Sequence, residues 1–346
     1  MQEEKGQATD TAAPPRRPWP RRVLRAAAWS MAALLVLLAA VLALGWWWIG
    51  TDSSLAAVLH RAARYLPAGQ TLEAREVTGS LRRGGAIGHL RWQSPTMAVE
   101  VEGARIGWSL GPLLQRRVQL GEVHAARIVI EPRGPKEEPS PPPEPLTGLV
   151  LPVQIELPFR VDDLQWKGPP PVQATGLAGR YVFDGQDHRL KIDGVDLATP
   201  VQGHYSAEAQ LQGAAPMALK LALDGRLSAP LEEGRSMELA LRATADGTLA
   251  GADARLAVQA QAAPTEQADG TQPMDAQVEA RIAPWAPQPV IDALAKMRHL
   301  DVALLWPQGP RTLLTGEAAV EPDPAAGTQA WKLRADIANA EPGPWD

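Results

Sequence analysis

The chain of 346 residues contains no cysteine. This absence excludes a disulfide framework, a thiolate metal site and a cysteine nucleophile. Aromatic residues are also scarce, at 5%, and most of them are Trp, so any core must be built mainly from Leu, Val, Ile and Ala. The six His residues are scattered and show no metal-ligand spacing. We therefore expect no metal ion and no cofactor.

Motifs of catalysis and of nucleic-acid binding are absent as well. The glycine-rich residues 84–88 lack the spacing of a dinucleotide-binding loop and are predicted to form a β-turn. The pairs Asp162 with Asp163 and Asp193 with Asp196 are typical of turns, where carboxylates accept hydrogen bonds from nearby amides. The net charge is −5, without a basic stripe, which argues against nucleic acid as a partner. The sequence predicts no enzyme, and a tethered hydrolase is a minor alternative.

One long apolar run lies near the N-terminus. No charged residue occurs from Ala26 to Thr51, and a helix needs about 20 residues to cross the hydrocarbon core of a bilayer. Arginines precede the run and tryptophans end it, an arrangement typical of a membrane anchor whose N-terminus is cytoplasmic. A cleaved signal peptide is the alternative, although its apolar region is usually shorter. The predicted membrane-interface anchors are Arg21, Arg22, Arg25, Trp46, Trp47 and Trp48.

The pattern along the chain predicts five regions. Residues 1–22 are polar and proline-rich and are expected to be a disordered cytoplasmic tail. Residues 23–50 form the transmembrane anchor. Residues 51–131 begin with a short amphipathic helix and continue as a first β unit. Residues 132–149 are a proline-rich linker or loop, and residues 150–346 form a longer β region.

Beyond the short helix, apolar and polar residues alternate with a period of two. MAVEVEG and VQIELPFR show the pattern, and RLKIDGVDL, HYSAEAQLQ, ALKLALDGRL, MELALRA, ARLAVQAQA, DAQVEARI and AWKLRAD repeat it. Asp-Gly pairs at 193–194, 224–225 and 246–247 are predicted to be turns between or just beyond these strands. The spacing indicates an antiparallel meander. A second short helix is predicted from Val290 to Arg298, because its apolar residues have helical spacing.

The predicted fold is therefore mainly β, with a transmembrane helix, short helices and an elongated antiparallel sheet. Each strand has one apolar face, which leaves two alternatives. The strands either close into a sandwich with an ordinary core, or curl into an open groove whose apolar inside stays available for acyl chains. The residues predicted to line such a groove are Val99, Val101, Ile155, Leu157, Leu219, Leu221, Leu223, Leu239, Leu241, Leu256, Val258 and Leu333.

The region from WWWIGTDSSLAAVLHRAARYLPAG to VHAARIVIE resembles the N-terminal part of the TamB family, which is AsmA-like. The matching elements are the Trp-rich end of the anchor running into Thr51, the Gly79-Ser80-Leu81 step, the strand around Trp92 and the strand from Val123 to Ile130. The segments APWAPQPVIDALAKMRHLDVALLWPQGP and NAEPGPWD are similar to that family too.

This resemblance implies an inner-membrane subunit of the translocation and assembly module of Gram-negative bacteria. It implies a long β groove in the periplasm, phospholipid transfer toward the outer membrane, and support of outer-membrane protein assembly. The implied partners are phospholipid, the inner membrane, and an outer-membrane protein of the TamA class that binds a C-terminal region absent from this chain. Because family members are far longer, we expect a truncated chain. The alternative function is a tethered scaffold that binds outer-membrane strands by β-augmentation.

Overall fold

The computed structural model describes residues 44–45, 47–109, 112, 116–133, 144–199, 202–230, 236–265, 274–302, 311–323, 325 and 330–341. The chain divides into two units, Met1–Ile49 and Gly50–Asp346. The predicted anchors Arg21, Arg22, Arg25 and Trp46 lie outside the described residues, as does most of the apolar run. Trp47 and Trp48 are helical, with exposed fractions of 70% and 44%. Within the described ranges, no helix is long and apolar enough to cross a membrane.

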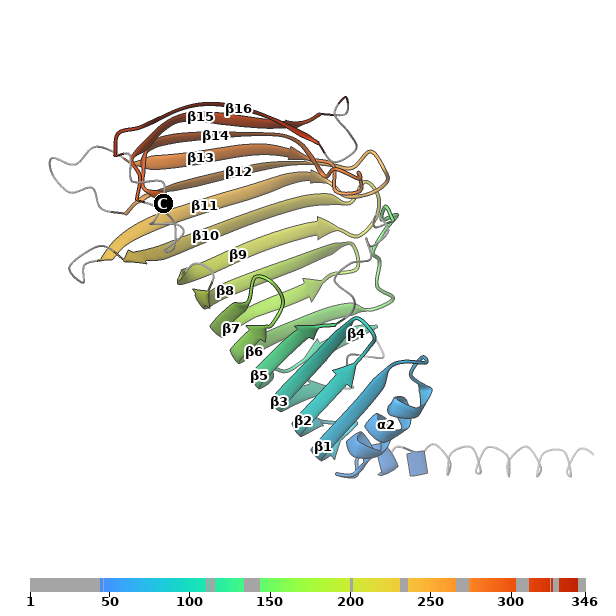
Figure 1. Ribbon diagram of the computed structural model, residues 1–346. Helices are drawn as coiled ribbons and strands as arrows, with labels where there is room; N and C mark the ends of the chain where they lie inside the picture. Colours follow the sequence, from blue (N-terminus) through green and yellow to red (C-terminus); the bar gives the residue numbers. More distant parts are fainter. Residues whose placement is uncertain are drawn as a thin grey trace, which may run out of the picture. The chain divides into compact units, whose positions relative to one another are not determined.

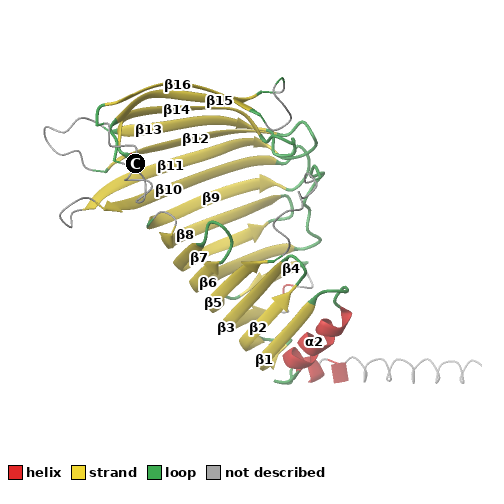
Figure 2. Cartoon of the chain, in the orientation of Figure 1, coloured by secondary structure: helices red, strands yellow, loops and turns green. Residues whose placement is uncertain are grey.

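The second unit is built on one continuous sheet of 16 strands (Figure 1). Figure 2 shows that strands make up nearly all of it and that α2 lies beside β1. The predicted mainly β fold is thus confirmed. The strands are β1 (Thr71–Ser80), β2 (Gly84–Gln93), β3 (Met97–Ser109), β4 (Arg117–Leu120), β5 (Val123–Pro132), β6 (Gln154–Trp166), β7 (Val172–Phe183), β8 (Asp187–Thr199), β9 (Gly203–Gln212), β10 (Ala218–Pro230), β11 (Ser236–Thr248), β12 (Arg255–Pro264), β13 (Asp275–Ile282), β14 (Val290–Leu300), β15 (Leu314–Pro322) and β16 (Trp331–Asn339).

Most neighbouring strands are antiparallel, as predicted, but the pairing around β6 is different. β6 pairs in parallel with both β4 and β5, while β5 also pairs antiparallel with β3. Parallel neighbours require a long connection, and the proline-rich residues between β5 and β6 provide it. The sheet therefore continues across this proline-rich segment.

The predicted short amphipathic helix is present as α2 (Ser54–Ala62), followed by the short 3-10 helix η1 (Ala63–Tyr65). Pro67 and Gly69 follow, and the chain turns back into β1. α2 contacts β1 and shares a hydrogen bond with the turn that follows this strand, where the Leu81 amide donates to Ser54 Oγ at 3.0 Å.

The helix predicted from Val290 to Arg298 is wrong, because these residues form strand β14 between β13 and β15. Val290, Ala293, Ala295 and Met297 pair with apolar or small residues of β13. From Ala293 to Met297 the period of two suits a strand, and pairing on both sides overrides the helical spacing.

The predicted turns at Asp-Gly pairs are also wrong, since all three pairs lie inside strands β8, β10 and β11. At two of them the glycine makes room for a ring. A Cβ on Gly225 would lie 2.8 Å from Cδ1 of Tyr205, and one on Gly194 would lie 2.9 Å from Cε1 of His204. Likewise, residues 84–88 are not a β-turn but the first residues of β2.

Candidate functional site

The sheet has one apolar face and one polar face throughout its length. Side chains of directly opposed residues point to the same face. In β10, Leu221 is opposed by Ala209 of β9 and Ala245 of β11, whereas the adjacent Lys220 is opposed by Gln210 and Asp246. This division continues to β16, where Leu333 is opposed by Val320 and Lys332 by Glu321.

The structure places all the predicted lining residues on the apolar face. Val99 and Val101 are opposed by Trp92 and Leu90 of β2 and by Ile130 and Ile128 of β5. Ile155 and Leu157 are opposed by Phe183 and Tyr181. The remaining members follow the same pairing in β10, β11, β12 and β16: Leu219, Leu221, Leu223, Leu239, Leu241, Leu256, Val258 and Leu333.

These residues do not form a closed core. Leu239 is fully buried and packs with Tyr205 and Leu227, whereas Leu333 is 68% exposed. The other predicted lining residues are all partly exposed. Because the facing layers of a sandwich bury such side chains in a dry core, the partial exposure indicates an apolar face that remains accessible.

A row of skipped residues, across which the strand register is unchanged, keeps this face apolar across the first half of the sheet. One residue per strand drops out of the pairing, and the alternation of faces shifts by one at that point. In β6, Val161 is opposed by Leu177, Asp162 is skipped, and Leu164 is then opposed by Ala174. These residues form the skipped-residue row: Glu76, Gly88, Gly103, Ala126, Asp162 and Gly176. Three of them have positive φ, namely Glu76, Gly103 and Gly176.

The apolar residues that follow this row in their strands were not predicted to line the apolar face. Strict alternation from Val161 places Leu164 on the polar face, but the pairing places it with Trp166, Ile128 and Ile130 on the apolar face. The sequence contains a sign of this shift, because the apolar positions 157, 159 and 161 are spaced by two, whereas the next apolar positions are 164 and 166. A skipped residue in each neighbouring strand re-aims the side chains that follow it without changing which residues are opposed.

The polar face is covered by ion pairs between neighbouring strands. Arg127 Nε lies 3.2 Å from Asp163 Oδ2, and His124 Nε2 lies 2.9 Å from Asp162 Oδ2. Asp162 and Asp163 therefore lie in structural pairs. Among the described residues, no group of His, Asp and Glu side chains could hold a metal ion.

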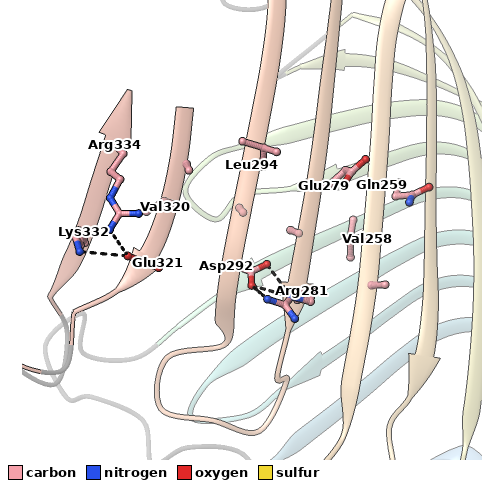
Figure 3. A pocket seen from close by; sticks show the side chains of 14 residues that line it. Val258, Gln259, Glu279, Arg281, Asp292, Leu294, Val320, Glu321, Lys332 and Arg334 are labelled. Atoms are coloured by element: carbon pink, nitrogen blue, oxygen red, sulfur yellow. Dashed lines mark hydrogen bonds and ion pairs between the residues drawn. The ribbon is translucent and has the colours of Figure 1, made fainter. Parts of the chain in front are cut away.

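Two hollows also lie over this polar face. One, of about 720 Å³, is lined by Arg189, Lys191, Glu208, Lys220 and neighbouring residues. Another, of about 430 Å³, extends from β12 to β16 (Figure 3). In it Arg281 donates to Asp292, lowering the pKa of that carboxyl, and Lys332 and Arg334 both reach Glu321. Exposed pairs of this kind contribute little to stability, and they mark a solvated surface.

A strap of residues 144–153 lies along the ends of several hairpins. Its Leu149 amide donates to Gly213 O at 2.7 Å, and Leu146 forms a bridge with Ala250. His188, on the apolar face, joins Leu149 O at 2.6 Å through Nε2 and the Tyr181 hydroxyl at 2.7 Å through Nδ1. Burial raises the pKa of Tyr181. The strap therefore holds one margin of the sheet by main-chain bonds and one histidine.

Comparison with known proteins gives one family match. Residues 40–164 match the family model described as TamB, N-terminal domain. Among the described residues, this match spans α2, β1 to β5 and nearly all of β6, and it includes all members of the skipped-residue row except Gly176. No curated protein and no solved structure matches the chain significantly.

Proposed function

We propose that this chain, which carries the TamB N-terminal domain over residues 40–164, moves phospholipid along the apolar face of its sheet. The observation that carries the proposal is the continuity of that face from β1 to β16, together with the partial exposure of its side chains. A face that offers hydrocarbon contacts without a covering layer suits acyl chains. At a strand spacing of about 4.8 Å, the sheet gives a track on the order of 70 Å long.

The proposal includes a place in the cell. The apolar run from Ala26 to Thr51 would anchor the chain in the inner membrane with its N-terminus in the cytoplasm, and the sheet would form an open apolar groove in the periplasm. Lipid would leave toward the outer membrane through a partner of the TamA class, and outer-membrane protein assembly would depend on it. No catalytic step belongs to this function.

Neighbouring residues of β10 provide the test. A photo-reactive amino acid at Leu221, on the apolar face, should capture phospholipid in cells, and the same residue at Lys220, on the polar face, should not. The two positions are adjacent and differ only in the face they occupy. Equal capture at both positions, or capture of protein alone at Leu221, would contradict lipid transfer.

A second candidate is a scaffold that adds outer-membrane protein strands to the sheet. The observation that favours it is β16, whose nine residues are all exposed and which pairs with β15 alone among the described strands. An unpaired edge offers main-chain donors and acceptors to a new strand. In this case, probes in β16 would capture unfolded outer-membrane protein, and the probe at Leu221 would capture no lipid.

A further inference from the structure

The N-terminal half of α2 is fixed to the sheet. The Ser54 side chain is fully buried, and its hydroxyl donates to Thr51 O at 2.8 Å and accepts from the Leu81 amide at 3.0 Å. Leu55 is 8% exposed, and a Cβ on Gly85 would come within 2.9 Å of it. Gly85 precedes Ile87 on the apolar face, so the first turn of α2 covers this face at its β1 end.

The other end of the helical segment leaves a gap. A cavity of about 240 Å³ separates Leu59, His60 and Ala63 from residues 72–75 of β1. Leu72 and Ala74 are opposed by Trp92 and Leu90, and therefore belong to the apolar face. The cavity is thus continuous with the surface proposed to carry lipid.

The lining of this cavity is amphipathic. Leu59, Ala63, Leu72 and Ala74 contribute hydrocarbon, whereas His60, Glu73 and Arg75 contribute polar groups. The side chain of Arg75 is largely exposed, and its guanidinium lies 3.5 Å from Glu73. The apolar part suits an acyl chain, and the Arg75 guanidinium suits a lipid phosphate.

The sequence before the helix indicates where such a ligand comes from. α2 begins at Ser54, three residues after the uncharged run of Ala26 to Thr51 ends. If this run is the membrane anchor proposed above, α2 lies near the bilayer surface. Phospholipid of that bilayer is therefore the nearest source of acyl chains.

We propose that the cavity between α2 and β1 is a portal through which one acyl chain of a membrane phospholipid reaches the apolar face. This proposal rests on the lipid-transfer function proposed above. In it, the helical segment of α2 and η1 is fixed to the sheet at Ser54 and Leu55 and stands away from it at Leu59 and Ala63. The portal defines one end of the track, so lipid meets β1 and β2 before the later strands.

The absence of cysteine allows a test in the full chain in its membrane. Ala63→Cys places a single thiol in the cavity, and Ala62→Cys places one on the adjacent, exposed position. Each variant is labelled after folding with a bulky maleimide, and a photo-reactive residue at Leu221 reports phospholipid. We expect the labelled Ala63→Cys chain to lose lipid capture at Leu221. The unlabelled Ala63→Cys chain and the labelled Ala62→Cys chain should retain it.

A second readout separates the portal from the proposed function. A photo-reactive residue at Ala63 itself should capture phospholipid, and one at Ala62 should not. If Leu221 captures lipid regardless of the label at Ala63, or if Ala63 captures only protein, the portal is wrong while lipid transfer stands. If Leu221 of the unlabelled chain captures no lipid at all, the proposed function fails and the portal fails with it.

Discussion

Leu239 and Leu333 lie on the same apolar face but differ in burial. Leu239 is 0% exposed and packs with Tyr205 and Leu227, whereas Leu333 is 68% exposed on β16. Leu239→Ala should lower the free energy of unfolding by about 2 to 5 kcal/mol, because it opens a cavity in a filled site. Leu333→Ala should change it by less than about 0.5 kcal/mol. Chemical denaturation of the two variants measures the difference, and equal effects would contradict the assigned burial.

Asp184 provides a pH-dependent contribution in the turn between β7 and β8. The amides of Asp187 and Gln186 donate to its carboxylate and lower its pKa below the ordinary 3.8, and the nearby Arg189 adds a smaller effect. Because the folded state depresses this pKa, the stabilisation is present above pH 3.8 and is lost as the pH falls through the folded value.

Asp184→Asn should therefore lower the melting temperature slightly at neutral pH, and the difference from the parent chain should disappear in acid. Arg189→Gln should retain most of the effect, since the backbone amides contribute more than the arginine. Melting curves measured between pH 2 and pH 7 test both variants. A difference that is independent of pH would mean that the charge of Asp184 has no part in it.

Among single elements, strands with a regular period of two are predicted well from the sequence. Segments that also fit a helix or a turn are predicted poorly. The period of two in β10 and β12 identifies an apolar face directly. In β14 the residues Val290, Ile291, Leu294 and Met297 also satisfy helical spacing, and only pairing with β13 and β15 decides between the two structures. Gly225 follows Asp224 and therefore predicts a turn. The reason for this glycine is the Tyr205 ring, which belongs to another strand. Such outcomes depend on neighbours that local patterns do not contain.

The skipped residue in β6 has a definite consequence. Inserting one alanine between Asp162 and Asp163 would shift the alternation by one further residue and turn Leu164 and Trp166 to the polar face, while Asp163 and Gln165 would turn to the apolar face. We expect this insertion to abolish folding of the sheet around β6. Asp162→Ala keeps the residue count and loses only the exposed pair with His124, so its stability should change little. Circular dichroism and proteolysis distinguish the two results.

The strap depends on His188. His188→Phe keeps a ring of similar size but removes the hydrogen bonds to the Leu149 carbonyl and the Tyr181 hydroxyl, each of which contributes about 0.5 to 1.5 kcal/mol. Hydrogen exchange at the Leu149 amide, which donates to Gly213, should become faster, while the amides of β10 keep their protection. His204→Phe, on the exposed polar face, serves as the control and should leave the strap unchanged.

For the whole molecule, the essential property is that the apolar face is continuous and open. If lipid enters at β1 as proposed, a charge on the apolar face of one strand can block its movement without unfolding the sheet. Leu221 is partly exposed in the middle of this face, so the carboxylate of Leu221→Asp can keep some of its hydration. In a closed sandwich the same charge would lie in a dry core and cost several kcal/mol, a large fraction of the roughly 5 to 15 kcal/mol that stabilises a typical domain.

We therefore expect Leu221→Asp to fold normally and to block lipid movement past β10. A photo-reactive residue at Ile155 of β6, between the portal and the block, should still capture phospholipid, whereas one at Val258 of β12, beyond the block, should not. Ala222→Asp adds the same charge to the polar face of the same strand and should leave capture at both positions intact. Unfolding of Leu221→Asp would indicate a closed core. Undiminished capture at Val258 would show that lipid reaches β12 by another route, and movement along the sheet from β1 would then be wrong.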